Sequence, residues 1–363
     1  MPGFVEITPW HWAGFIFCVL IFLALDLGLF HRRARVVKFK EAAAWSAVWF
    51  ALAMVFAGAM AHWRGREEAI QFTTGYLIEL SLSLDNILVI ALIFAWFRIP
   101  VKFQHRLLFW GILGALVMRG AMIAAGVELI NQFDWVLYVF GAFLVFTGGK
   151  MLFAGQETVQ PEKNLALRLA RKCFAVSPDL DGQKFFTRLR GRSPEGLAQI
   201  NPSQMPRVEP GGKDSGAAKA RLDGRLALTP LAVVLLLIET TDLIFALDSV
   251  PAVFSVTRNA FIVFTSNIFA ILGLRSLYFL LAGALGCFRY LKIGLSFVLA
   301  FVGAKMLLDP HGQEPKRFQV EIPTGVSLMV VVAIIVIAIV LSVMVAEREK
   351  RTGAGNSSKP QAE

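Results

Sequence analysis

The sequence predicts an all-α polytopic membrane protein with about nine transmembrane helices. Its 363 residues are 56% hydrophobic and only 17% charged, and the mean hydropathy is +0.62, which is unlike the composition of a soluble domain. Apolar runs of roughly 20 residues, the length that crosses a bilayer, recur along the chain. These runs lack the alternation of barrel strands, and in lipid only helices and closed barrels satisfy the backbone. The spans are therefore expected to be helices.

The predicted spans lie near residues 10–30, 42–61, 70–96, 106–128, 132–153, 229–256, 260–284, 288–308 and 324–346. The chain accordingly divides into peripheral spans one and two (1–69), a first three-span unit (70–153), a basic loop (154–228), a second three-span unit (229–308), and span nine with a polar tail (309–363). We expect the first span to be retained rather than cleaved as a signal peptide, because the cations of "HRRARVVK" follow its apolar run and none precedes it.

Lysine and arginine predict the orientation. They concentrate in residues 31–40, 98–106, 154–228 and 289–292 and in the "EREKR" tail, which all fall on one side of a nine-span chain. That side is expected to be cytoplasmic, with the N-terminus outside and the C-terminus inside. Topology and anionic lipid then explain the net charge of +10, so we expect no nucleic-acid partner.

The loop 154–228 holds 13 Lys or Arg and 8 Asp or Glu. Its segment "NLALRLARKCFAV" has helical spacing and predicts a helix on the inner leaflet. Residues 193–221 are rich in Pro, Gly and Ser and predict a disordered linker, although membrane or envelope proteins could also bind this loop. The three cysteines Cys18, Cys173 and Cys287 show no paired spacing, so neither a disulfide framework nor a thiolate metal site is indicated.

Two matched motifs predict an internal repeat. "ELSLSLDN" (79–86) and "DLIFALDS" (242–249) share the form acid, five residues, Asp, small polar residue. In the third helix of each unit, "FTGGKML" parallels "FVGAKML", and each unit carries one intramembrane arginine between its motifs. Spans three to five and six to eight then form three-helix units of opposite orientation. Inverted units of this kind hold transported substrate near the midplane.

Carboxylates within the spans are the candidate functional residues. A charge at the bilayer centre costs about 2.5 to 3.5 kcal/mol on insertion scales, so five such acids indicate a function. The predicted metal-binding residues are Glu79, Asp85, Asn86, Glu239, Asp242 and Asp248; the charge-balancing candidates are Arg119, Lys150, Arg275 and Lys305; and the polar supporting residues are Ser83, Thr240, Thr241, Ser249 and Asn267. The alternative is that buried salt bridges neutralise the acids. We expect the two lysines to extend to the interface, which leaves two arginines for five acids.

Oxygen donors without His or Cys suit Mn²⁺, Ca²⁺ or Mg²⁺, and this set does not choose among the three ions. Helix geometry adds a constraint, because Asp248 lies about 180° around the helix from Glu239 and about 13 Å along it. Either two sites lie along a path, or span six breaks between Thr240 and Ser249, which is the alternative that we predict.

Exchange with protons is the expected cycle. Crowded carboxylates bind protons when metal is absent, and metal binding releases them. Export of a divalent ion against about 100 mV, inside negative, costs about 4.6 kcal/mol, so export needs such coupling.

At this point the motifs resemble a known family. "ELSLSLDNILVIALIF", "LFWGILGALVMRGAMI", "VSPDLDGQKFF" and the stretch from "TPLAVVLLLIETTDLIFALDS" to "FTSNIFAILGLRSLYFLL" look like the TerC/Alx family of integral membrane proteins, over most of residues 10–308. The resemblance implies a bacterial inner-membrane protein, originally associated with tellurite resistance and now read as an exporter of Mn²⁺. It also implies that the six metal-binding candidates line the path of the ion. Mn²⁺ would be a transported substrate, and no permanent cofactor is expected.

Other functions receive less support from the sequence. It lacks the GxGD, HExxH and GxSxG patterns of hydrolases, so no enzyme is predicted. Five acids would repel the oxyanion of a tellurite carrier. The remaining alternatives are a Ca²⁺/H⁺ exchanger and a membrane scaffold associated with tellurite resistance.

Overall fold

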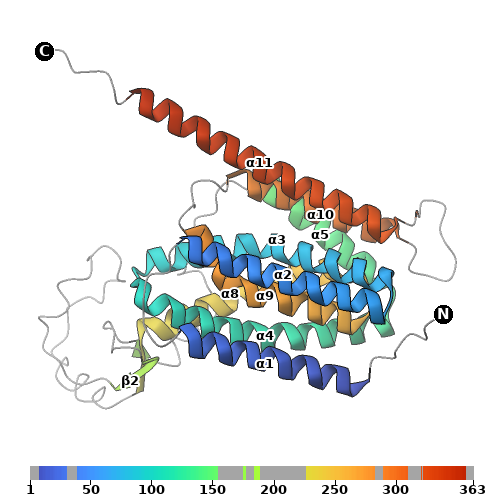
Figure 1. Cartoon of the computed structure of the whole chain (residues 1–363), viewed down its shortest axis with the longest axis horizontal. Helices are drawn as coiled ribbons and strands as arrows, with labels where there is room; N and C mark the ends of the chain where they lie inside the picture. The colour runs from blue at the N-terminus through green and yellow to red at the C-terminus, as the bar shows by residue number, and fades with distance from the viewer. Residues whose placement is uncertain are drawn as a thin grey trace, which may run out of the picture.

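The structure is a computed structural model that describes residues 8–30, 39–153, 175–176, 184–188, 226–282, 289–309, 320 and 322–356. Within these residues the chain forms nine helices and three short strands (Figure 1). The helices are α1 (Pro9–Phe30), α2 (Phe39–Trp63), α3 (Arg66–Trp96), α4 (Val101–Gln132), α5 (Trp135–Phe153), α8 (Pro230–Phe254), α9 (Ala260–Ala282), α10 (Arg289–Leu308) and α11 (Thr324–Asn356). The strands are β1 (Ala175–Val176), β2 (Phe186–Arg188) and β3 (Leu226–Leu228).

The predicted fold class, an all-α polytopic membrane protein, is confirmed. Seven helices of the described part are long and apolar enough to cross a bilayer, namely α2, α3, α4, α5, α8, α9 and α11. In α1 the apolar stretch Pro9–Ala24 is shorter. The helix boundaries follow the predicted apolar runs closely, because in lipid a continuous apolar run forms its backbone hydrogen bonds within a helix.

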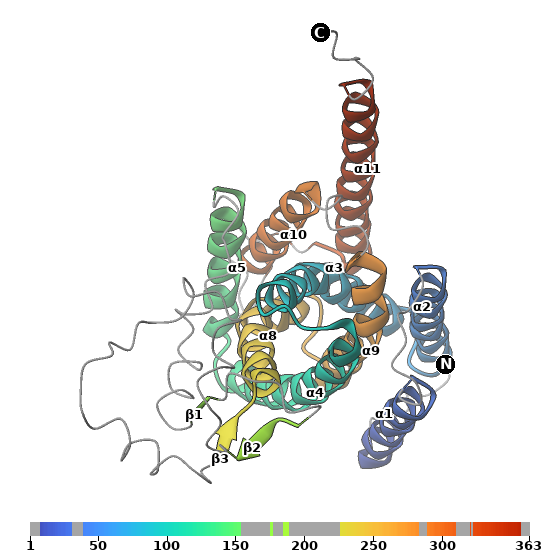
Figure 2. The same ribbon diagram turned by 90° about the vertical axis from the view of Figure 1, so that its left-hand side faces the viewer.

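Helices α3, α4, α8 and α9 surround the centre of the molecule when it is viewed along the bundle (Figure 2). Helices α1 and α2 lie outside this group of four, and α2 packs on α3 and α9. The contact of α2 with α3 and α9 is partly aromatic: Phe56 of α2 packs against Phe72 of α3 and Phe269 of α9. Helix α11 packs on α10 and α3.

Helices α5 and α10 form the most extensive helix pair in the structure. A Cβ atom placed on Gly148 would lie 2.8 Å from the carbonyl oxygen of Ser296, and one placed on Gly303 would lie 2.7 Å from the carbonyl oxygen of Gly141. Glycine therefore lets the two backbones touch, as small residues do between membrane helices. Gly148 and Gly303 occupy matching positions in the two "K-M-L" motifs, so the contact is reciprocal. The inverted repeat would produce this reciprocity, and the repeat itself stays a prediction.

Helix α8 is continuous, so the predicted break between Thr240 and Ser249 is wrong. Thr229 caps its first turn by accepting a hydrogen bond from the Ala232 amide at 3.4 Å, and Pro230 occupies the first turn, where its missing amide does no harm. Pro251 lies in the last turn and has no amide to donate to the carbonyl oxygen of Leu247, yet the helix continues to Phe254. The polar residues in the middle of α8 do not interrupt its backbone hydrogen bonds, because no glycine or proline lies among them.

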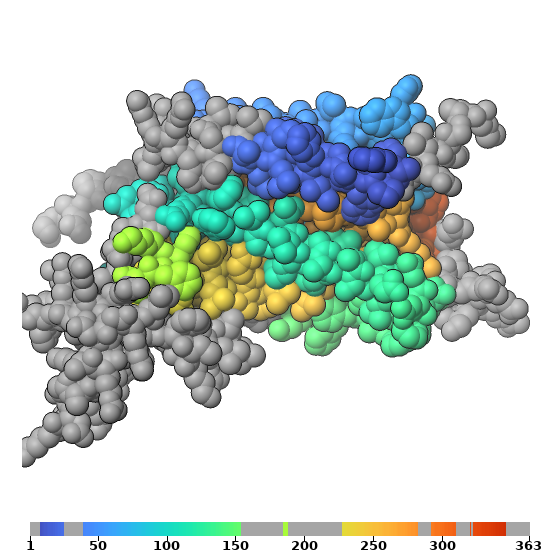
Figure 3. All heavy atoms as spheres, turned by 90° about the horizontal axis from the view of Figure 1, so that it is seen from below, coloured from blue at the N-terminus to red at the C-terminus, as the bar shows by residue number. Residues whose placement is uncertain are grey.

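A small mixed sheet precedes α8, with strand order β1-β3-β2. Strand β3 pairs parallel with β1 and antiparallel with β2, in the registers Val176 to Leu228 and Phe186 to Leu228. The amphipathic helix predicted for residues 164–176 is wrong at its end, where Ala175–Val176 forms β1; the rest of that segment and the linker 193–221 lie outside the described residues. On the face shown in Figure 3, β2 lies beside the start of α8.

Candidate functional site

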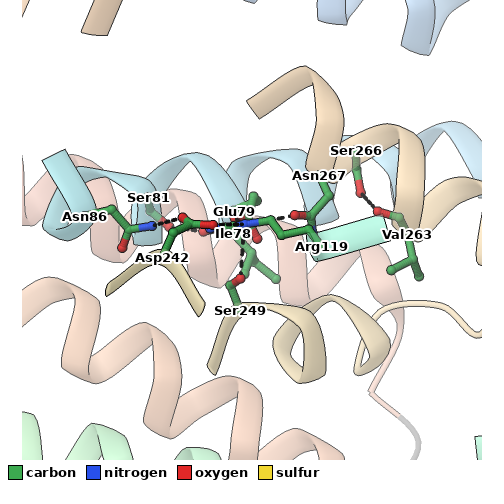
Figure 4. Close-up of polar contacts among 10 residues, drawn as sticks. All are labelled: Ile78, Glu79, Ser81, Asn86, Arg119, Asp242, Ser249, Val263, Ser266 and Asn267. Atoms are coloured by element: carbon green, nitrogen blue, oxygen red, sulfur yellow. Dashed lines mark hydrogen bonds and ion pairs between the residues drawn. The ribbon is translucent and has the colours of Figure 1, made fainter. Parts of the chain in front are cut away.

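Arg119 of α4 lies at the centre of a polar cluster formed by four helices (Figure 4). Its Nε and Nη2 atoms donate to the two carboxylate oxygens of Asp242 of α8, at 3.1 and 2.9 Å. Its Nη1 atom donates to Glu79 of α3, to Ser249 of α8 at 3.2 Å and to Asn267 of α9 at 3.0 Å. Arg119 and Glu79 are both 0% exposed. A buried charge of this kind is tolerated only when it is paired and hydrogen-bonded, as here.

Oxygen atoms next to this pair remain without hydrogen bonds. Asn86 of α3 donates its Nδ2 atom to Asp242 at 3.5 Å, while its Oδ1 atom has no partner. The Oε2 atom of Glu79 and the hydroxyl of Ser83 are likewise buried without a partner. These three side chains follow one another at intervals of four and three residues, so they share one face of α3. Buried acceptors without partners are rare, and this row of three fits a cation or water molecules.

Glu239 lies one helical turn before Asp242 and is partly exposed. A Cβ atom added to Gly114 of α4 would lie inside contact distance of all three carboxyl atoms of Glu239. The carboxylate therefore occupies space that only glycine leaves open. Glu239 forms no hydrogen bond or ion pair with the described residues, and Asp242 repels its charge. It is thus an uncompensated carboxylate beside the Arg119 cluster.

Asp85 and Asp248 point away from Arg119 to two other helices. Asp248 accepts a hydrogen bond from Thr147 and interacts electrostatically with Lys150, both on α5. Asp85 interacts electrostatically with Lys292 of α10. The second acid of each repeated motif therefore lies near a lysine on the α5–α10 pair. Glu239 and Asp248 do lie on opposite faces of α8, as the helix geometry predicted, since their partners belong to α4 and α5.

The predicted metal-binding residues therefore occupy several places. Glu79, Asn86 and Asp242 meet at Arg119, Glu239 is adjacent, and Asp85 and Asp248 are separate. Across the residues that the structure describes, no three His, Cys, Asp or Glu side chains form a group that could hold a metal ion. Because α8 does not break, the remaining alternative is that two metal sites lie along a path. The assignment of metal ligands stays a prediction.

The polar supporting residues have different roles. Ser249 and Asn267 accept hydrogen bonds from Arg119. The hydroxyls of Thr240 and Thr241 instead donate to the carbonyl oxygens of Leu236 and Leu237 in their own helix, at 2.6 and 2.7 Å. Both threonines therefore satisfy their hydroxyl donors locally.

The charge-balancing candidates also differ from expectation. Lys150 is exposed, but Lys305 is only 4% exposed, so the expectation that it extends to the interface is wrong. Lys305 donates to the carbonyl oxygen of Ser255 at 3.3 Å and lies 3.7 Å from a carboxylate oxygen of Asp309. The ammonium of Lys305 is therefore held inside the protein by Asp309 and by the carbonyl oxygen at the end of α8.

Arg275 matches Arg119 in the sequence repeat but lies elsewhere. Its Nη2 atom is 3.2 Å from the Nδ1 atom of His105 near the start of α4, and the ring of His105 stacks on Phe279. The two arginines therefore have unlike surroundings.

The sequence analysis missed Gly114, Thr147, Lys292 and His105. "WGILGAL" carried one available signal, because two glycines three residues apart indicate a close approach at one helix face. Lys292 was assigned to a loop, and no local signal paired it with Asp85.

Comparison with known proteins identifies the family. Residues 64–350 match the Integral membrane protein TerC family, and these residues contain every helix of the central cluster. The chain belongs to the TerC family. It is therefore an integral multi-pass membrane protein, and the resemblance seen in the motifs is confirmed.

Relatives of this TerC family protein match it over almost their whole length. An uncharacterized membrane protein of Myxococcus xanthus is 47% identical over 353 residues, which are 97% of each chain. The Escherichia coli K12 protein named "Putative membrane-bound redox modulator Alx" is 40% identical over 357 residues, which are 96% of this chain and 98% of the relative. A membrane protein of Rickettsia felis is 35% identical over 333 residues, 92% of this chain and 97% of its own. No solved structure matches the chain.

Proposed function

We propose that this TerC family protein is a secondary transporter that exports a divalent metal ion, Mn²⁺ in the first place, from the cytoplasm of a bacterium in exchange for protons. One observation carries the proposal. Two acids, Glu79 and Asp242, share Arg119 between α3, α4 and α8, and a third, Glu239, lies one helical turn from Asp242 without a cation partner among the described residues. The cluster holds more negative charge than the arginine neutralises.

The chemistry of the donors supports a hard divalent ion. Carboxylate, amide and hydroxyl oxygens suit Mn²⁺, Mg²⁺ and Ca²⁺. The unpartnered oxygens of Glu79, Ser83 and Asn86 supply ligands from one helix face. Asp242 and Glu239, one helical turn apart on α8, supply charge from the facing helix.

The position of the cluster supports transport rather than storage. Glu79 is 13 residues from the start of α3, and Asp242 is 12 residues from the start of α8, so both lie deep within their helices. A site at that depth between two three-helix units is where secondary transporters bind their substrates. In the proposed orientation the ends at which α4 and α8 begin face the cytoplasm.

Proteoliposomes test this function. The purified protein is reconstituted with a fluorescent metal indicator inside, and Mn²⁺, Ca²⁺ and Mg²⁺ are added in turn under an imposed pH gradient. Mn²⁺ flux that follows the gradient and collapses with a protonophore is expected. Absence of Mn²⁺ flux beside a working reference exporter contradicts the proposal, and flux of Ca²⁺ alone establishes the Ca²⁺/H⁺ alternative.

The E. coli relative is named a redox modulator, and cysteine is the side chain that redox chemistry would use. A variant without cysteine therefore separates metal transport from a redox role. Cys18 is free and exposed, and Cys173 and Cys287 lie outside the described residues. Replacement of all three by serine is expected to leave Mn²⁺ flux intact. Loss of flux in a correctly folded variant would favour a redox role instead.

A further inference from the structure

We propose that Arg119 competes with the transported cation for the carboxylates of Glu79 and Asp242, so that it is an internal substitute for the ion and drives its release. This inference rests on the proposed function and specifies how the same site works. It gives Arg119 a direct part in the cycle rather than a fixed structural role.

The geometry of the guanidinium supports the competition. Arg119 bridges Glu79 of α3 and Asp242 of α8, and it takes both oxygens of Asp242 in a parallel pair of hydrogen bonds. These oxygen lone pairs are those that a metal ion would use. Arginine keeps its proton in proteins, so it does not leave the acids by becoming neutral. Metal and guanidinium therefore exclude each other at these atoms.

Arg119 leaves several oxygen atoms of the site without a hydrogen bond. The Oε2 atom of Glu79, the Ser83 hydroxyl and the Oδ1 atom of Asn86 are buried and unpartnered beside it. A guanidinium offers donors in one plane, whereas a divalent ion takes about six oxygen ligands around it. The site thus has more oxygen ligands than Arg119 uses, which favours replacement by an ion.

Neutral acceptors offer Arg119 a second position. Its Nη1 atom also donates to the hydroxyl of Ser249 and to the Oδ1 atom of Asn267, on α8 and α9. Both residues are buried. When an ion takes the carboxylates, these two oxygens still bind the guanidinium, which spares the protein an unpaired buried charge. The arginine is then held next to the ion and returns when the ion leaves.

The test is Mn²⁺ affinity in purified full-length protein, read from the electron paramagnetic resonance signal of the free ion. Arg119→Gln removes the competitor and keeps a polar side chain, so Mn²⁺ should bind about tenfold more tightly or better. Transport in proteoliposomes should fall by a similar factor, because the ion is released slowly. Equal or weaker binding by the variant overturns the inference.

Two further variants keep the test decisive. Arg258→Gln is the matched control, because Arg258 also pairs with an aspartate, Asp134, at 2.9 Å, but on the exposed surface; its Mn²⁺ affinity should equal that of the wild type. Arg119→Lys keeps a charge and loses the paired hydrogen bonds, so it should bind Mn²⁺ more tightly than wild type and less tightly than Arg119→Gln. If Arg119→Gln does not fold, the lysine variant decides, and affinity no higher than that of the wild type overturns the inference.

The outcomes separate the two proposals. Wild-type protein that neither binds nor transports Mn²⁺ removes the proposed function, and the competition with it. Wild-type protein that transports Mn²⁺, together with an Arg119→Gln variant that binds it no better, removes only the competition.

Discussion

Arg119 and Asp242 are 123 residues apart in the chain, yet two parallel hydrogen bonds of 3.1 and 2.9 Å join the guanidinium to the carboxylate. The pair ties α4 to α8, and the contact with Glu79 extends it to α3. Parallel bonds of this kind are the strongest that arginine forms with a carboxylate. The pair therefore both stabilises the helix group and places two acids at one point.

Asp242→Asn should destabilise the protein strongly. The substitution preserves side-chain shape but leaves Arg119 with one buried counter-ion, and breaking a buried pair typically costs about 3 to 5 kcal/mol. Thermal unfolding in detergent without added metal measures the effect. Asp134→Asn is the control, because the Arg258–Asp134 pair has the same 2.9 Å distance but is exposed, and such pairs contribute about 1 kcal/mol or less. Equal effects of the two substitutions would contradict the central role of the buried pair.

Gly114→Ala should impair transport with little loss of folding. Its methyl group would occupy the space of the Glu239 carboxylate, which must then turn away from the cluster. Alanine itself favours the helix over glycine by about 1 kcal/mol. We expect Mn²⁺ flux to drop by about tenfold or more, since a displacement of one ångström at a site has effects of this size.

Gly120→Ala is the matched control on the same helix. Its Cβ atom would meet the ring of Phe264 at 3.4 Å, an ordinary contact. Normal flux is expected from this variant. Equal flux through both alanine variants would show that Glu239 does not need its position against Gly114.

Gly148→Ala should weaken the α5–α10 pair. A Cβ atom there would lie 2.8 and 2.9 Å from backbone atoms of Ser296 and Ala300, so the helices must separate, and overpacking typically costs about 1 to 3 kcal/mol. A Cβ atom on the adjacent Gly149 would have no atom of the described residues within 4 Å, so Gly149→Ala should be neutral. Unfolding in detergent compares the two. The interpretation of Gly148 as a packing residue is wrong if both variants unfold alike.

Substitution of Asp85 and Asp248 together by asparagine tests whether these two acids belong to the ion path. Both acids interact with lysines on the α5–α10 pair, and both lie within spans. We expect Mn²⁺ flux to fall by about tenfold or more, because an acid within the membrane is costly and is typically kept for function. Glu128→Gln, at an exposed position, is the control. Retained flux in the double variant would place both acids outside the ion path.

The sequence by itself determined the spans, the order of the helices and the acids that lie inside them. Length and apolar composition are local properties, and lipid leaves a continuous apolar run little choice but a helix. The same reasoning identified Arg119 as one candidate to balance the charge of the acids within the spans. It placed Glu239 and Asp248 on opposite faces of α8, since helical geometry is fixed within one element.

Tertiary structure alone decided which charges meet. Arg119 takes two acids from two helices while Arg275 contacts His105, although both arginines hold the same place in the sequence repeat. Lys305 is buried while its counterpart Lys150 is exposed. The physical reason is that pairing depends on the depth and rotation of each helix, which close contacts such as those at Gly114 and Gly148 set. No local pattern in the sequence specifies those two quantities.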